Sequence, residues 1–176
     1  PRRGECGARP PLPPPMPMPT PGVIERIGLD YQSVKKINPK IIYASLTGYG
    51  EIRPDSKRTA LDSTAYFARS GLMEWAKTDE AKGVPPFPIP GGGDHPTGLS
   101  LFTSILLGLM NREKTGLGTT VSTSLLANGI WSNAMLVQAL LAGHNPIDTF
   151  HWDTLSAMRN IYYLKDGTLF FMLLTN

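Results

Sequence analysis

Residues 90–98 read Pro90-Gly91-Gly92-Gly93-Asp94-His95-Pro96-Thr97-Gly98. An apolar pattern with helical spacing follows it, and we expect a helix over residues 96–112. Glycines let the backbone adopt positive φ and approach a ligand closely. The start of a helix adds free N–H groups and the positive end of a dipole. The stretch therefore predicts that the Asp94 carboxylate lies beside backbone donors, where an acyl group could be held and attacked.

The same stretch also has a purely structural interpretation, in which Asp94 is an ordinary helix N-cap with proline in the first turn. A phosphate-binding loop is excluded, because a Walker A loop needs Lys and then Ser or Thr after its last glycine. Here an aspartate follows, and its negative charge would repel phosphate. No G-x-G-x-x-G motif opens the helix, so the dinucleotide-binding fingerprint is absent as well.

Two segments outside this stretch predict strands. The run Ile41-Ile42-Tyr43-Ala44, within residues 40–46, is typical of a buried parallel strand. Residues 118–123 predict a second, short strand. The residues Thr47-Gly48-Tyr49-Gly50 form the turn at the C-terminal end of the first strand. Because ligands bind at the carboxyl ends of strands in open α/β sheets, we expect this turn to lie near a site.

Turn and cap residues divide the rest of the chain into short elements. Asn38-Pro39 stops a helix, because proline disfavours helical φ and ψ in the residue before it. Asp166-Gly167 between two apolar runs is a strong hairpin signal. The expected helices are 22–29, 31–37, 61–69, 96–112 and 124–141; residues 77–90 are expected to form a loop, and 160–164 and 168–174 the hairpin strands.

Composition limits the class of protein. The hydrophobic content of 41% is that of a globular domain. The net charge of +3 comes mainly from residues 1–22, so a nucleic-acid-binding face has little support. The single cysteine, Cys6, excludes an internal disulfide and is compatible with a reducing compartment. No apolar run reaches the roughly 18 residues of a membrane-spanning helix, and the N-terminus lacks the apolar region of a secretory signal.

The chain divides into four parts by composition. Residues 1–21 are rich in proline, and we expect a disordered tail there. Residues 22–143 form part of a large domain, residues 144–159 a linker, and residues 160–176 the start of a small domain. Since the chain has no initiating Met and stops inside an apparent strand, we interpret it as a fragment of a longer protein.

Four ordered pieces of the sequence carry a resemblance to a known family. They are PGVIERIGL at 21–29, NPKIIYASLTGYG at 38–50, Gly93-Asp94 with Gly98, and REKTGLG at 112–118 running into VSTSL at 121–125. The set resembles the class III coenzyme A transferases, which include formyl-CoA transferase, carnitine and bile-acid CoA transferases and α-methylacyl-CoA racemase. The resemblance covers about residues 21–174.

The resemblance implies a fold, an activity and a set of site residues. The fold would be α/β, with part of a Rossmann-like large domain, a linker and the start of a small domain. The protein would move coenzyme A, a substrate rather than a bound cofactor, between acyl-CoA thioesters and carboxylic acids. It would work as an interlocked homodimer, in the cytoplasm or, in a eukaryote, in mitochondria or peroxisomes. The implied residues are the nucleophile Asp94, the acyl loop Gly91, Gly92 and Gly93, and the CoA-binding residues Arg26, Ile27, Tyr49 and Leu125.

The chain departs from the family pattern in two places. An Asn-Phe-x-Pro-Gly run of the family is replaced here by Met18-Pro19-Thr20-Pro21-Gly22. Formyl-CoA transferase has Lys and Tyr where this chain has Thr59 and Leu61, so a specificity for oxalate or formate does not carry over.

Two other functions stay open. The racemase branch moves an α-proton between His and Asp, and its Gly-His-Asp run aligns with Ala60-Leu61-Asp62. Leu61 cannot transfer a proton, which argues against racemisation. The other alternative is an inactive fragment or an interaction module with a proline-rich tail.

The remaining candidate residues have structural interpretations. We expect Asp62 to be a helix N-cap, His95 a solvated residue in the second helical turn, and Trp131 with Met135 part of the core. Lys57 and Arg58 could meet CoA phosphates, although a solvated charge pair is the simpler interpretation. His144 and His151 have no partners at metal-ligand spacing, so we expect no metal site.

Overall fold

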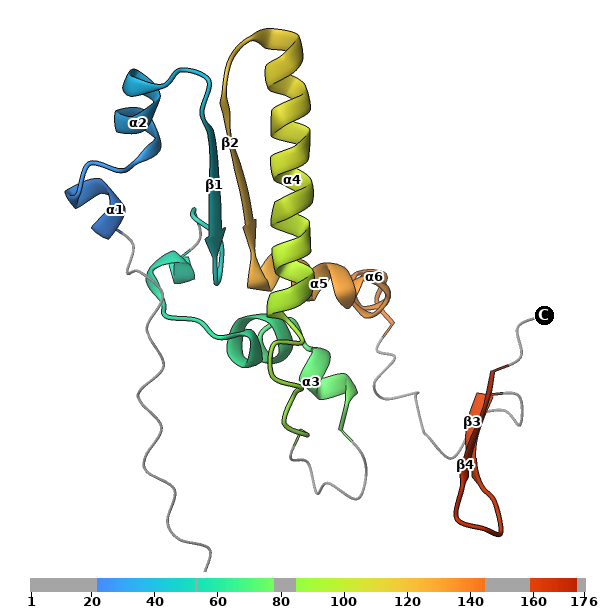
Figure 1. Cartoon of the computed structure of the whole chain (residues 1–176). Helices are drawn as coiled ribbons and strands as arrows, with labels where there is room; N and C mark the ends of the chain where they lie inside the picture. Colours follow the sequence, from blue (N-terminus) through green and yellow to red (C-terminus); the bar gives the residue numbers. More distant parts are fainter. Residues whose placement is uncertain (1–21, 53, 78–84, 145–158, 174–176) are drawn as a thin grey trace, which may run out of the picture.

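The computed structural model describes residues 22–52, 54–77, 85–144 and 159–173 (Figure 1). The predicted tail 1–21, most of the predicted linker 144–159 and residues 78–84 of the predicted loop lie outside the described residues. Among the described residues, no helix is both long and apolar enough to cross a membrane.

Two parallel strands form the sheet that organises the chain. Strand β1 (Ile42–Thr47) pairs with β2 (Thr119–Ser124), in a register that runs from Ile42 opposite Thr119 to Thr47 opposite Ser124. The predicted strands and the parallel direction of the first are therefore confirmed, each within one or two residues. The prediction that the first strand is buried is wrong: five residues of β1 are half-buried and Ala44 is exposed, because the described sheet has only two strands and β1 has a neighbour on one side only. A parallel pair needs a long crossover connection, and that connection contains helix α4 (Asp94–Thr115). The predicted α/β fold class is confirmed.

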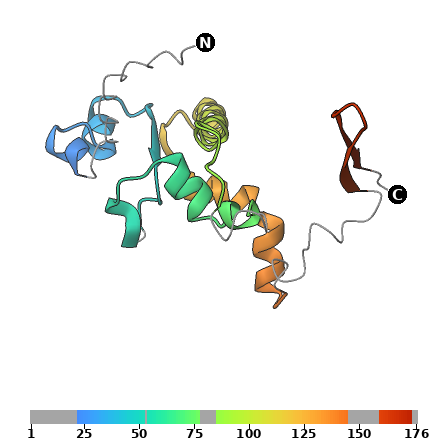
Figure 2. The ribbon, with the colours of Figure 1, turned by 90° about the horizontal axis from the view of Figure 1, so that it is seen from below.

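Helix α4 packs along one face of the two strands (Figures 1 and 2). Its contact point is the buried Gly108, where a side chain would meet Ile42 Cγ2 at 3.1 Å and Val121 Cγ1 at 3.3 Å. The helix begins at Asp94, two residues before the predicted start, and runs to Thr115. It ends at Gly116, whose φ of 72° gives the left-handed C-cap that glycine adopts without steric cost.

Two short helices cover the opposite face of β1. Alternate residues of a strand point to opposite faces, so Tyr43 points away from α4. Its ring lies 5.8 Å from the ring of Tyr31, and its hydroxyl donates to the Leu29 carbonyl at 2.9 Å. Helix α1 spans Val23–Arg26, shorter than predicted, and α2 spans Tyr31–Ile37, as predicted.

Asp30 caps helix α2 and makes the stability of this region depend on pH. Its carboxylate accepts hydrogen bonds from the hydroxyl and from the N–H of Ser33. These bonds, the hydroxyl's most of all, lower the pKa of Asp30 below its usual value. A lowered pKa stabilises the fold above the unfolded-state pKa, and this stabilisation is lost as pH falls through the folded-state pKa. Asp30→Ala should therefore lower the melting temperature at neutral pH and lower it less in acid. If Asp30→Ala lowers the melting temperature by the same amount at neutral and at acid pH, this prediction is contradicted.

The segment after β1 carries the core of the molecule. After a 3-10 turn, η1 (Pro54–Lys57), comes η2 (Asp62–Ala68), followed by α3 (Leu72–Trp75). The helix predicted over 61–69 exists, but η2 is a π-helix, a rare conformation that is frequent at functional sites. The buried cluster consists of Ala60, Ala65, Tyr66 and Leu125, with Tyr49, Phe67 and Leu72 packed against it.

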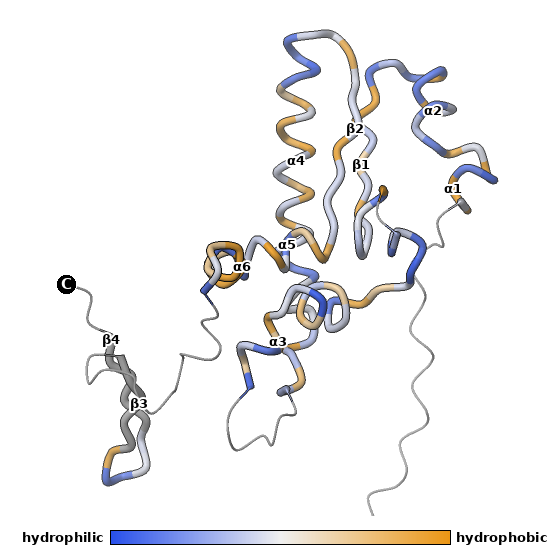
Figure 3. The backbone as a smooth tube through the Cα atoms, turned by 180° about the vertical axis from the view of Figure 1, so that it is seen from behind, coloured by the Kyte–Doolittle hydropathy of each residue, from blue (hydrophilic) through white to orange (hydrophobic). Residues whose placement is uncertain are grey.

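The single helix predicted over 124–141 is wrong, because the chain breaks at Asn133. Helix α5 covers Leu125–Ser132 and α6 covers Ala134–Leu141, both rich in apolar residues (Figure 3). The buried Asn133 takes φ −100° and ψ 17°, and its Nδ2 donates to the Ser70 carbonyl at 2.8 Å. The prediction that Trp131 and Met135 belong to the core is also wrong, since they lie on different helices and are 76% and 90% exposed.

Two strands near the C-terminal end form the predicted hairpin. Strands β3 (Arg159–Tyr163) and β4 (Leu169–Leu173) pair antiparallel across Asp166-Gly167. Gly167 has φ 83°, and the Asp166 carboxylate accepts the N–H of Thr168 at 2.9 Å. The local turn residues thus produce the hairpin, as the Asp-Gly signal predicts.

Candidate active site

The glycine stretch forms a tight turn that leads into helix α4. Gly91 has φ 76°, and its carbonyl accepts the N–H of His95 at 3.0 Å. Gly93 is the N-cap residue, and no side chain caps the helix there. Asp94 is the first helical residue and is exposed. The interpretation of Asp94 as the N-cap is therefore wrong, and within the described part of the chain its carboxylate has no hydrogen-bond or ion-pair partner.

The residue before Asp94 is enclosed by other elements. Gly93 is buried, and a Cβ on it would lie 2.6 Å from Cγ of Tyr66 on η2. Its N–H donates to Oδ2 of Asp62 at 3.4 Å, and its carbonyl accepts the hydroxyl of Thr97 at 2.7 Å. A Cβ on Gly92 would lie 2.9 Å from the Ile89 carbonyl oxygen. The glycines at 92 and 93 are thus sites of close packing as well as parts of a turn.

The N–H groups of this turn have different partners. Gly92 donates to the Ile89 carbonyl at 2.9 Å, and Gly93 donates to Asp62, so neither is free to bind a ligand. Within the described residues, the N–H groups of Gly91 and Asp94 have no acceptor. These two are the backbone donors that the turn offers beside the Asp94 carboxylate.

Two neighbouring residues differ from their sequence interpretation. Asp62 is the first residue of η2 rather than its N-cap, which is Leu61. Its carboxylate accepts the N–H of Ser63 at 2.6 Å and reaches across to Gly93. His95 lies in the first turn of α4, not the second, and its exposed imidazole is placed against Gly91. Nothing local in the sequence signals the contact between Asp62 and Gly93, which are 31 residues apart.

The residues predicted to bind CoA fall into two groups. Tyr49 and Leu125 meet at the buried cluster around Tyr66, the residue on which Gly93 packs; Leu125 is only 2% exposed. Arg26 and Ile27 lie at the end of α1 and are exposed, with Arg26 Nε donating to the Gly22 carbonyl at 3.2 Å. The structure therefore brings Tyr49 and Leu125 together and leaves Arg26 and Ile27 on a separate element.

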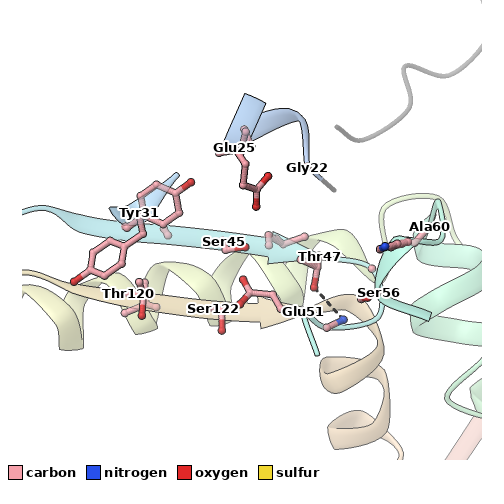
Figure 4. A pocket seen from close by; sticks show the side chains of 18 of the residues that line it. Gly22, Glu25, Tyr31, Ser45, Thr47, Glu51, Ser56, Ala60, Thr120 and Ser122 are labelled. Atoms are coloured by element: carbon pink, nitrogen blue, oxygen red, sulfur yellow. Dashed lines mark hydrogen bonds between the residues drawn. The ribbon is translucent and has the colours of Figure 1, made fainter. Parts of the chain in front are cut away.

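A cavity of about 650 Å³ lies between α1 and the sheet face that points away from α4. Figure 4 shows its floor, where Ser45 and Thr47 come from β1 and Ser122 comes from β2. Its walls include Gly22 and Glu25 from the α1 region and the segment 56–60, with Lys57 and Arg58. The Arg58 guanidinium pairs with Asp55 at 3.0 Å. None of the four predicted CoA-binding residues is among the residues that line the cavity, although Glu25 precedes Arg26 and Gly48 and Gly50 flank Tyr49 in the sequence.

The described residues offer no ready metal site. No group of three or more His, Cys, Asp or Glu side chains among them is placed to hold a metal ion.

Comparison with known proteins identifies the family. The sequence profile of CoA-transferase family III matches residues 19–176. The cinnamoyl-CoA:phenyllactate CoA-transferase of Clostridium sporogenes is 39% identical over 113 residues, 64% of this chain and 27% of that protein. The human succinyl-CoA:glutarate CoA-transferase is 38% identical over 110 residues, 62% of this chain and 24% of that protein.

Solved structures agree with the sequence comparison. The crystal structure of a CAIB/BAIF family protein from Brucella suis matches with a TM-score of 0.70 and 28% identity, covering 85% of this chain and 39% of that one. A hypothetical protein of Mycobacterium tuberculosis matches with a TM-score of 0.65 and 27% identity, covering 71% of this chain and 35% of that one. The fold of the described residues is thus shared with parts of larger proteins. The chain belongs to CoA-transferase family III, as its sequence predicts, and it spans about a quarter of the two curated relatives.

Proposed function

We propose that the protein transfers coenzyme A between acyl-CoA thioesters and carboxylic acids, with Asp94 as the nucleophile. One observation carries the proposal: the Asp94 carboxylate is exposed and without a partner in the described chain, at the start of α4 beside the free N–H groups of Gly91 and Asp94. A structural carboxylate at a helix start normally caps backbone donors, and Asp94 caps none.

The proposed reaction has balanced steps. A carboxylate oxygen of Asp94 attacks the thioester carbonyl and the C–S bond breaks, which gives a mixed anhydride and CoA thiolate. The thiolate attacks the Asp94 carbonyl carbon, which releases the donor acid and leaves an aspartyl-CoA thioester. The acceptor carboxylate attacks this thioester and again displaces the thiolate. The thiolate then takes the new acyl group from the second anhydride and restores Asp94.

Each step passes through a tetrahedral intermediate whose oxygen carries negative charge. The N–H groups of Gly91 and Asp94, at the positive end of the α4 dipole, are the available donors for that charge. One preorganised donor of this kind is worth about 3 kcal/mol of activation free energy. The acyl-loop role predicted for the three glycines is therefore proposed for the N–H of Gly91, with Gly92 and Gly93 shaping the turn.

The cavity is the proposed place for the CoA part of the substrate. It runs along the face of β1 and reaches the turn at the C-terminal end of that strand, where ligands of α/β sheets bind. Lys57 and Arg58 bring positive charge to one wall and could pair with phosphate groups. Arg26, Ile27 and Tyr49 do not line this space, so their CoA-binding role is proposed from the resemblance alone. Leu125 is buried, so its proposed role is to support the site by packing in the cluster around Tyr66 rather than to contact CoA.

An oxygen-tracing experiment tests the proposed intermediate. In the steps above, one oxygen of the acceptor acid ends on Asp94 after each turnover, and the next donor acid carries it away. The complete protein, given an acyl-CoA and an ¹⁸O-labelled acceptor acid, should yield an Asp94-containing peptide that carries ¹⁸O. Direct attack of the acceptor on the thioester would label the released donor acid but not the peptide. An active protein with an unlabelled Asp94 peptide would therefore exclude the aspartyl mechanism.

Relatives are named for acids as different as phenyllactate and glutarate, and the chain has Thr59 and Leu61 at positions tied to formate and oxalate in the resembling enzyme. Mass spectrometry of CoA exchange with a panel of acids would identify the donor and acceptor acids.

The racemase alternative is disfavoured by one residue. Leu61 occupies the position of the racemase His, and its apolar, 51% exposed side chain has no group that moves a proton. Loss of α-deuterium from a labelled 2-methylacyl-CoA, without any acceptor acid, would favour racemisation instead. The interlocked homodimer, the cytoplasmic location and the four-part domain division stay predictions.

A further inference from the structure

We propose that Asp62 is a positioning residue for the nucleophile, because its carboxylate accepts the N–H of Gly93, the residue directly before Asp94. The inference rests on the proposed function, and it assigns a role to a residue that the sequence presents as a helix cap. Its basis is the hydrogen bond from the Gly93 N–H to Asp62 Oδ2 at 3.4 Å, which joins η2 to the start of α4.

Gly93 is held on three sides. Asp62 accepts its N–H, Thr97 donates to its carbonyl at 2.7 Å through the hydroxyl, and the Tyr66 ring lies where a Cβ would be. Thr97 is fully buried, so this hydroxyl has no competing water. Of the three contacts, Asp62 alone provides a charge. At 3.4 Å the Asp62 contact is long for an N–H···O hydrogen bond, so the carboxylate acts on the Gly93 N–H through its charge rather than through a short bond.

The π-helix that carries Asp62 is itself fixed. Ser63 donates its N–H to Asp62 Oδ1 at 2.6 Å, which orients the carboxylate and leaves Oδ2 for Gly93. Four residues further along η2, Tyr66 forms a hydrogen bond of 2.6 Å between its hydroxyl and that of Ser132 on α5. A side chain at Gly129 of α5 would collide with the Tyr66 carbonyl, so the two elements are in close contact. The carboxylate of Asp62 therefore reaches Gly93 from a rigid support.

This arrangement explains how Asp94 can be both exposed and well placed. Its own side chain has no partner in the described residues, so its direction is set by the backbone of Gly93 and the first turn of α4. If the Gly93 peptide rotates, the carboxylate moves relative to the thioester carbonyl and to the Asp94 N–H. A displacement of about 1 Å in such a site can cost roughly 10²-fold in rate.

The test compares two substitutions at Asp62 with the same two at Asp30. Asp30 is a matched control, because its carboxylate also accepts backbone N–H groups and caps a helix that lines no part of the nucleophile turn. In the complete protein, Asp62→Ala should lower kcat about 10²-fold with an unchanged KM for the acyl-CoA. Asp62→Asn keeps one acceptor oxygen but loses the charge, and its kcat should lie between those of Asp62→Ala and wild type. Asp30→Ala and Asp30→Asn should keep the wild-type kcat per folded molecule.

A direct readout separates positioning from a loss of folded protein. Hydroxylamine captures the activated Asp94 as a hydroxamate, and the single-turnover rate of capture is measured per folded molecule. The Asp62 variants should be captured more slowly, by the same factor as their kcat. If Asp62→Ala does not fold, Asp62→Asn, which has nearly the same shape, carries the test alone.

The hydroxylamine experiment distinguishes a failure of the proposed nucleophile from a failure of the proposed positioning role. If wild type turns over but gives no hydroxamate at Asp94, the proposed nucleophile is wrong. If wild type is captured at Asp94 and the Asp62 variants are captured at the same rate, only the positioning role of Asp62 is overturned. A melting temperature lowered by Asp62→Ala with an unchanged capture rate would also overturn it, since Asp62 would then be purely structural.

Discussion

Replacing Asp94 with alanine should abolish CoA transfer and leave the fold intact. Removal of a covalent nucleophile lowers turnover by about 10⁴-fold or more. The structural cost is small, because the side chain is exposed and has no partner in the described residues. An acidic residue in the first helical turn contributes only about 0.3–1 kcal/mol through the helix dipole. Turnover and thermal unfolding, measured on the same preparation of the complete protein, check both statements.

The control for this variant lies on the same helix. Glu113→Gln, near the other end of α4, removes a carboxylate whose side chain is 79% exposed and 3.9 Å from Arg112, and it should leave turnover unchanged. Asp94→Asn preserves the shape of the side chain and should be as inactive as the alanine variant, since an amide is a poor nucleophile. Wild-type turnover in a folded Asp94→Ala protein would remove Asp94 from the mechanism.

Adding a single methyl group to Gly93 should damage both stability and activity. Gly93 has φ −93° and ψ −31°, a conformation open to alanine, so backbone strain is not the cause. The added Cβ would lie 2.6–2.9 Å from atoms of Tyr66. Overpacking of this kind costs about 1–3 kcal/mol. Moving the Gly93 peptide away from Asp62 should lower turnover roughly 10²-fold as well.

Gly98→Ala on the same helix isolates the packing effect. At Gly98 a Cβ meets nothing within 4 Å, and alanine favours a helix over glycine by about 1 kcal/mol, so this variant should unfold at a higher denaturant concentration. Equal stability changes in the two variants would contradict the packing explanation. A bulky residue at Gly92 should also lower stability, because its Cβ would lie 2.9 Å from the Ile89 carbonyl oxygen and 3.1 Å from the Phe67 ring.

Several elements follow from the sequence because their causes are local. Helix α2 has its aspartate cap at Asp30 and its stop at Asn38-Pro39 within a few residues of each other. The hairpin needs only Asp166-Gly167 between two apolar runs. The apolar run within β1 predicts the strand but not its burial, since Ala44 is exposed and the other residues of β1 are only half-buried. The sequence also places Asp94 directly after three glycines at the start of a helix, while its exposure and its lack of a capping role come from the structure.

Other features depend on residues far apart in the chain. The break at Asn133 satisfies a carbonyl at Ser70, 63 residues earlier, and no helix-breaking residue marks it. The contact between Asp62 and Gly93 and the packing of Gly93 on Tyr66 exist only because η2 lies against the nucleophile turn. The sequence by itself determined the α/β pattern, the local turns and the position of Asp94, since caps, turns and periodicity act over a few residues. Tertiary structure alone decided which groups surround Asp94, because burial and hydrogen bonding between distant segments depend on how the whole chain packs.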